Sequence, residues 1–134
     1  MKKLILLSFV FLTSVFCLSA QDAAKQAAPA QFTKTELLAF PDVKAILKAI
    51  DKTQDYSTYM VRNFNITTTI TNADGTTSKL SEMGPGGTVS AKQKELIQKY
   101  AVKGVVFSLE NVTMIESGKK GKTELSSASL TIKE

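Results

Sequence analysis

Residues 56–75 read YSTYMVRNFNITTTITNADG, and this stretch decides the fold. Its tyrosine, valine, isoleucine and threonine residues favour extended backbone. Phe64, Ile66 and Ile70 fall on one face with polar residues between them. We therefore expect a long, half-buried strand from Tyr56 to Thr71, because a strand turns alternate side chains to opposite faces of its sheet.

The same stretch predicts a bulge and a hairpin. Val61 and Phe64 break the two-residue alternation if both are buried, which predicts a bulge near Arg62-Asn63. Asn72-Ala73-Asp74-Gly75 predicts a tight turn, because Asp-Gly tolerates the positive φ angles that such turns require. The segment from Thr76 to Met83 is then the returning strand.

A helix is expected after this hairpin. Gly84-Pro85-Gly86-Gly87 ends the returning strand. Ser90 followed by Gln93 forms a capping-box pattern, in which the two side chains satisfy free backbone amides of the first helical turn. Gly104 is the expected stop. The inner stripe of this helix holds Leu96, Ile97, Tyr100 and Ala101, and its solvent side holds Lys92, Lys94, Glu95, Gln98 and Lys99.

Further strands and short helices complete the domain. Val105 to Ile115 and Leu125 to Ile132 are expected strands, joined through residues 117–121. Before the long strand, apolar residues recur at helical spacing, which predicts two short helices, the second from about Pro41 to Ile50. Alternating polar residues in every strand predict a sheet with one wet face. The expected fold is α+β and β-rich: an antiparallel sheet or sandwich, with element order about α-β-β-α-β-β and one main helix packed on it.

The N-terminus predicts export. Lys2 and Lys3 precede an apolar stretch from Leu4 to Leu18, which is too short to span a bilayer comfortably. We expect residues 1–20 to be a signal peptide, cleaved between Ala20 and Gln21, and a retained membrane anchor is the weaker alternative. Cys17 raises the further alternative of a lipoprotein, but the residues before it lack the expected leucine and small residue. A periplasmic location is expected, with secretion as the alternative.

One domain should follow the signal. Residues 21–31 contain no large apolar side chain, which predicts a flexible linker. The length of residues 32–134 predicts a single domain. The chain carries 17 Lys and Arg against 12 Asp and Glu, a net charge of +5, which falls to +3 without Lys2 and Lys3. The lysines alternate with acids along the chain, and nucleic acid is not an expected partner because it requires a clustered basic face.

The inventory of reactive side chains is small. The chain has no histidine, and its one cysteine lies in the predicted signal, so the usual zinc ligands and the commonest general base are missing. We expect no catalysis, metal or cofactor. A carboxylate pair is the remaining enzymatic alternative, with Asp55, Glu82, Glu110 and Glu116 as its candidates. Gly121-Lys122-Thr123 has a P-loop ending, but Glu116 stands where the motif needs glycine, and we interpret the segment as a hairpin turn.

Several segments, taken in order, resemble one family. They are Val61-Arg62-Asn63-Phe64, Asp74-Gly75, Gly84-Pro85-Gly86-Gly87 with Ser90, Leu96-Ile97, Gly104-Val105-Val106-Phe107 and Glu110-Asn111-Val112. Together they resemble the C-terminal domain of GldM/PorM, the periplasmic motor protein of gliding motility and type IX secretion in Bacteroidota. The lead-in Thr33 to Val43 is also similar, so the resemblance covers roughly Lys34 to Glu134.

The resemblance implies a β-rich periplasmic domain that makes protein contacts and carries no catalysis. It departs from the family at the N-terminus, since the motor protein has an uncleaved membrane helix and several domains before this one. The segment Leu47 to Asp55 is also longer and more polar than the family's link. The resemblance therefore bears on fold and contact-making more than on a role in a motor.

Two functional hypotheses follow. The first is a stand-alone exported interaction module with an envelope protein as partner. Its expected contact elements are any free sheet edge and two loops, which contain Gly84, Pro85, Gly86, Gly87, Lys119 and Lys120. The second is a binder of a lipid or sugar held between sheet and helix, with a cavity lined by Phe64, Tyr100, Phe107 and Met114.

Overall fold

The threonine-rich stretch forms the central hairpin of the computed structural model, which describes residues 29–134. Strand β2 (Tyr59–Thr71) folds back onto β3 (Thr77–Pro85) through the predicted turn, in which Gly75 has a φ of 81°. The backbone N–H of Gly75 donates to the Asn72 carbonyl at 3.0 Å. The predicted bulge is confirmed, since the register between β2 and its other neighbour shifts between Val61 and Asn63.

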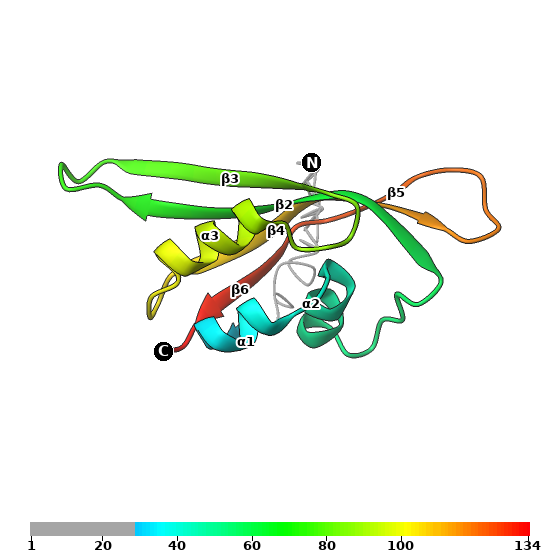
Figure 1. Cartoon of the computed structure of the whole chain (residues 1–134), viewed down its shortest axis with the longest axis horizontal. Coiled ribbons are helices and arrows are strands. Elements are labelled where there is room, and N and C mark those ends of the chain that lie inside the picture. Colours follow the sequence, from blue (N-terminus) through cyan, green and yellow to red (C-terminus); the bar gives the residue numbers. More distant parts are fainter. Residues whose placement is uncertain (1–28) are drawn as a thin grey trace, which may run out of the picture.

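The hairpin lies at one side of a mixed sheet of six strands (Figure 1). The strand order is β1-β6-β4-β2-β3, and β5 pairs with β4 off this path. β1 runs parallel to β6, and all other pairs are antiparallel. The remaining strands are β1 (Ala30–Phe32), β4 (Val106–Glu116), β5 (Thr123–Leu125) and β6 (Ala128–Ile132).

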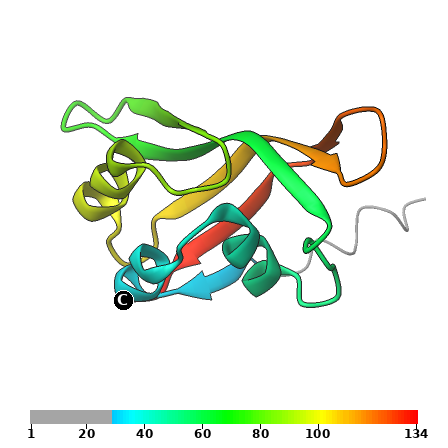
Figure 2. The same ribbon diagram turned by 45° about the vertical axis from the view of Figure 1, so that its right-hand side comes forward.

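Three helices lie on one face of the sheet (Figures 1 and 2). They are α1 (Lys34–Ala39), α2 (Val43–Ile50) and α3 (Ala91–Tyr100). Each begins at a side chain that accepts a backbone N–H of the first turn: Thr33 for α1, Asp42 for α2 and Ser90 for α3. The predicted capping box of Ser90 and Gln93 is confirmed.

The core fills the space between this sheet face and the helices. Phe64 and Ile66 of β2 and Phe107 of β4 are almost fully buried there, and Ile46 of α2 and Ile97 of α3 have no exposed surface. The opposite face, which we call the open face, carries mostly polar side chains together with the exposed Met83, and no helix of residues 29–134 covers it. Its side chains include Asn65, Thr67, Thr69, Ser81, Ser108 and Ser129.

The α+β, β-rich class is confirmed, but several details differ from the prediction. Residues 29–134 form one sheet, which is the first of the two expected architectures, and the two predicted short helices pack on it together with the main helix α3. The sheet is mixed because β1 adds parallel to β6. The predicted linker 21–31 therefore extends two residues too far, since Ala30 and Gln31 belong to β1. Backbone hydrogen bonds hold this strand, and they need no large side chains.

Other boundaries shift by a few residues. Pro41 lies before the N-cap of α2 instead of inside its first turn. Gly84 and Pro85 belong to β3, which continues past Met83. The short strand β5 was not predicted. The predicted signal peptide and its predicted cleavage site at Ala20 and Gln21 lie outside the described residues. Within residues 29–134, none of the helices is both long and apolar enough to cross a bilayer.

Candidate functional site

The outer edge of β3 has unused backbone groups. The N–H of Asn72 donates to Thr76 O at 2.8 Å, and the N–H of Gly86 donates to Arg62 O at 2.7 Å. Both bonds continue the register in which β2 pairs with β3, and on the β3 side they involve the even-numbered residues Thr76 and Gly86. Because hydrogen-bonded pairs alternate along an antiparallel ladder, the odd-numbered residues of β3 turn their N–H and C=O groups away from β2. These residues are Thr77, Lys79, Ser81 and Met83.

No strand of residues 29–134 pairs with this edge, since β3 ends the strand order. The free stretch from Thr77 to Met83 is about 20 Å long at roughly 3.4 Å per residue. Pro85 closes it, because proline has no N–H to offer to an added strand. An exposed row of backbone donors and acceptors of this length is a template for pairing with another chain.

A groove runs along this edge between β3 and α3. Its volume is about 580 Å³. One wall is β3 from Lys79 to Glu82, and the other is the outer side of α3, with α3 below β3 in Figure 1. The α3 residues that line it are Lys92, Glu95, Leu96, Lys99 and Tyr100. We call this hollow the β3 edge groove.

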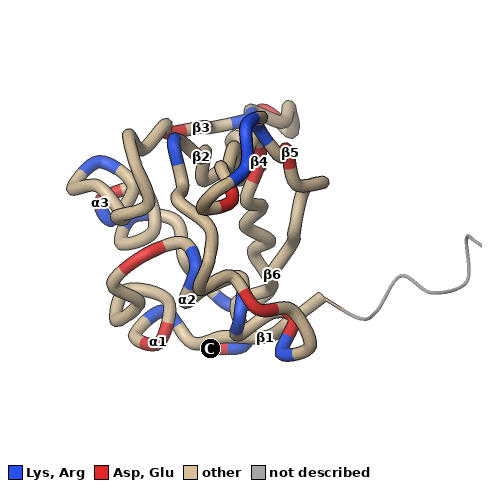
Figure 3. The backbone as a smooth tube through the Cα atoms, turned by 90° about the vertical axis from the view of Figure 1, so that its right-hand side faces the viewer, with Lys and Arg blue, Asp and Glu red and all other residues tan. Residues whose placement is uncertain are grey.

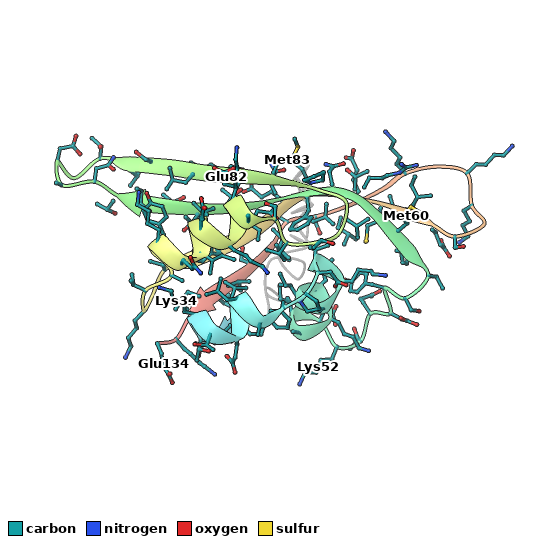
Figure 4. All side chains as sticks on the ribbon, in the orientation of Figure 1. Lys34, Lys52, Met60, Glu82, Met83 and Glu134 are labelled. Carbon is teal, nitrogen blue, oxygen red and sulfur yellow. The ribbon has the colours of Figure 1, made fainter. Side chains whose placement is uncertain are left out.

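Consecutive side chains of β3 point to opposite sides of the sheet. Glu82 lies on the groove side, whereas Met83 projects from the open face with 65% of its surface exposed (Figure 4). Lys79 also lies on the open face, where its Nζ is 2.9 Å from Glu110 Oε2. Glu110 Oε2 also accepts the Thr67 hydroxyl at 3.4 Å, and Thr67 is only 3% exposed although it faces the open side. Lys79 is therefore held toward Glu110 although it also belongs to the lining of the β3 edge groove.

A second hollow lies where β2 extends beyond β4. The β2 and β4 ladder ends at Thr68 and Phe107, three residues before β2 ends at Thr71. The space beside these last residues is an open cleft of about 850 Å³, which we call the β2–β4 notch. Its apolar lining comes from Ile70, Tyr100, Val102, Val105 and Val106. Lys99 lies over the Tyr100 ring, with 5.2 Å from Nζ to the ring centroid.

The predicted contact loop Gly84–Gly87 is largely used in packing inside the domain. Gly84 is buried, and a Cβ added to it would lie 2.6 Å from Gln93 Oε1. The Gly86 N–H donates to β2, and the Gly87 carbonyl accepts the Val43 N–H at 2.8 Å. Of the four predicted residues, only Pro85 has an exposed surface, while Gly86 and Gly87 are half-buried.

The predicted contact residues Lys119 and Lys120 lie in the turn between β4 and β5, and both are exposed. Lys119 Nζ is 2.7 Å from Glu116 Oε2. The hydrogen bond and the charge of Glu116 raise the pKa of Lys119. Gly118 and Gly121 take positive φ angles in this turn, which matches its interpretation as a hairpin.

Most of the residues that were predicted to line a ligand cavity belong to the hydrophobic core instead. Phe64 is 0% exposed, and Phe107 and Met114 are each 1% exposed within the hydrophobic cluster. Tyr100 is half-buried and is the only one of the four that lines a hollow described above.

The candidate carboxylates are dispersed over the domain. Glu82, Glu110 and Asp55 line three different hollows. Glu110 and Glu116 are each paired with a lysine. The backbone N–H of Ser57 lowers the pKa of Asp55 by donating to its carboxylate. Among residues 29–134, no group of three or more His, Cys, Asp and Glu side chains is arranged to hold a metal ion.

Comparisons with known proteins leave the geometry as the main guide. No protein-family model matches this sequence, and no curated protein is significantly similar to it. The sequence predicted that a free sheet edge is a contact element, but it did not indicate that β3 supplies this edge or that a groove lies beside it. The only signal for the groove was the row Lys92, Glu95 and Lys99 on the solvent side of α3, and that row does not reveal which strand lies beside it.

Proposed function

We propose that this chain is a non-catalytic, exported interaction module that binds an extended segment of a partner protein along the outer edge of β3. The observation that carries the proposal is the free backbone row from Thr77 to Met83 beside the β3 edge groove. In strand addition of this kind, backbone hydrogen bonds supply affinity, and a groove beside the edge supplies selectivity through side chains.

The partner belongs to the cell envelope in this proposal. Two sequence features support that location: the basic and apolar pattern of residues 1–20, and the resemblance to the C-terminal domain of GldM/PorM. A partner within the gliding or type IX secretion machinery follows from the resemblance alone. The dispersal of Asp55, Glu82, Glu110 and Glu116 supports the non-catalytic part of the proposal.

Two exposed methionines provide the test. Met83 is 65% exposed on the β3 edge, and Met60 is 63% exposed on β2, away from that edge. A photo-crosslinking amino acid placed at Met83 should give a discrete protein adduct in cells that export the chain, and the same amino acid at Met60 should not. Equal adducts at both positions, or none at Met83, would contradict binding at the β3 edge.

The second candidate function is the binding of a small ligand, and the β2–β4 notch favours it. Five apolar side chains together with threonine, lysine and glutamate side chains line this notch, so it offers both apolar and polar contacts to a lipid or a sugar, which the packed core does not. Native mass spectrometry of the purified protein should then detect a retained small molecule. Val106→Asp, at a residue that is 45% exposed, should abolish that retention without unfolding the domain. A ligand-free spectrum would exclude this candidate.

A further inference from the structure

The α3 wall of the β3 edge groove is predominantly basic. From Ala91 to Lys103 the chain carries four lysines and one glutamate: Lys92, Lys94, Glu95, Lys99 and Lys103. Figure 3 shows α3 with its lysines coloured blue and the glutamate red. Of these five, Lys92, Glu95 and Lys99 line the groove, and β3 adds Lys79 and Glu82 to its charged lining. The spacing of three and four residues between Lys92, Glu95 and Lys99 places them on one side of the helix.

The two groove lysines are available for a partner. Within residues 29–134, the ion pairs involve Lys79, Lys119 and Lys133, and neither Lys92 nor Lys99 has a carboxylate oxygen within 4.0 Å. Along the groove the helix therefore presents a positive charge, then a negative charge, then a positive charge. Lys92 and Lys99 are about 10.5 Å apart along the helix axis, at 1.5 Å per residue.

A strand added to β3 would face this pattern with every second side chain. Side chains on one face of a strand repeat about every 6.8 Å, so residues i and i+4 are about 13.6 Å apart. The spacing of about 10.5 Å between Lys92 and Lys99 is shorter than this spacing of about 13.6 Å, and the flexible lysine side chains can make up the difference. The residue at i+2 would then lie opposite Glu95.

We propose that the β3 edge groove selects an extended partner segment with acidic side chains at positions i and i+4 and a neutral or basic side chain at i+2. The inference rests on the proposed function and adds the chemistry of the partner to it. The flanking acids pair with Lys92 and Lys99, and an acid at i+2 is disfavoured because it would face Glu95.

A display library of random nonapeptides, selected against the purified protein, tests this directly. Enriched peptides should show the pattern of acid, non-acid, acid at alternate positions. The double variant Lys92→Glu, Lys99→Glu should bind a selected peptide at least about tenfold more weakly, because two attractive contacts become repulsive. The matched control is Lys94→Glu, Lys103→Glu, which changes the net charge equally outside the groove and should bind within about threefold of the unmodified protein.

Amide hydrogen exchange tests binding at the β3 edge separately from the charge pattern of the bound peptide. A bound peptide should slow exchange at the backbone N–H groups of Lys79, Ser81 and Met83, which face away from β2. Peptides that protect these amides but bind both double variants equally would overturn the charge pattern and leave the edge function intact. Selected peptides that protect none of them would overturn both proposals. If these amides become protected without peptide as the protein concentration rises, the edge binds a second copy of the chain, and the peptide proposal is overturned.

Discussion

The contact between Gly84 and Gln93 determines how α3 sits on the sheet, and substitutions at both residues test it. The Gln93 side chain is 0% exposed. Its Oε1 accepts the Ser90 N–H at 2.9 Å, and its Nε2 donates to Glu82 O at 3.1 Å. A Cβ at position 84 would lie 2.6 Å from Oε1 and 2.8 Å from Nε2. In Gly84→Ala the Gln93 amide must therefore move and lose these bonds.

The expected losses of stability follow from these contacts. Gly84→Ala combines overpacking, which costs about 1–3 kcal/mol, with a weakened capping box worth about 1 kcal/mol, so we expect a loss of about 2–4 kcal/mol. Gln93→Ala loses the cap, worth about 1 kcal/mol, an interior hydrogen bond worth about 1 kcal/mol and one buried methylene group worth about 0.8 kcal/mol. We expect about 3 kcal/mol for that variant.

The double variant distinguishes this contact from two independent effects. Without the Gln93 amide, the methyl group introduced by Gly84→Ala has room, so the free energy of unfolding of the double variant should fall by only about 3–4 kcal/mol instead of the additive value of about 5–7 kcal/mol. Urea denaturation of the four proteins measures the coupling. Gln98→Ala, at an exposed residue of the same helix, serves as the control and should be additive with Gly84→Ala. Additivity within about 0.5 kcal/mol in the Gln93 cycle would refute the contact as described.

Three further predictions concern the surface. Lys79→Ala should reduce the free energy of unfolding by no more than about 1 kcal/mol at low salt, because its partner Glu110 is a surface residue, and the difference should shrink at about 1 M salt in urea titrations. The Thr76 hydroxyl and amide lower the pKa of Asp74 below its ordinary value of 3.8, so this contact stabilises the fold above that pH. The melting temperature of Asp74→Asn should therefore approach that of the unmodified protein as the pH falls through the lowered pKa, and a difference independent of pH would count against the contact. Asn111 has a φ of 51°, so Asn111→Ala should lose about 1 kcal/mol and Asn111→Gly should lose nothing in the same urea assay, whereas equal losses would show that the side chain matters instead.

Local signals in the sequence predicted the elements well. The alternation around Phe64 and Ile66, the Asp74-Gly75 turn and the Ser90 and Gln93 capping box are each determined by residues a few positions apart, and each is present in the structure. The break in alternation beside Val61 located the bulge for the same reason. Such features depend on backbone preferences and short-range hydrogen bonds, which a single segment contains.

Long-range pairing was much harder to anticipate. β1 consists of Ala30-Gln31-Phe32, which resembles a linker by composition, and only its hydrogen bonds to β6 make it a strand. Gly84 was interpreted as part of a turn, because nothing near it in sequence indicates that Gln93 fills the space a Cβ would need. The alternation of the strand places Thr67 on the solvent face, yet it is only 3% exposed and its hydroxyl bonds to Ser81 and Glu110 of the neighbouring strands.

The amino-acid sequence by itself determined where strands, turns and helix caps form, and which face of each is apolar, because these depend on neighbours along the chain. Only the tertiary structure decided that β3 ends the sheet, that α3 lies beside its free edge, and that Lys92 and Lys99 line the groove between them. The physical reason is that strand order and helix placement depend on the packing of the whole core, to which every segment contributes and which no single segment specifies.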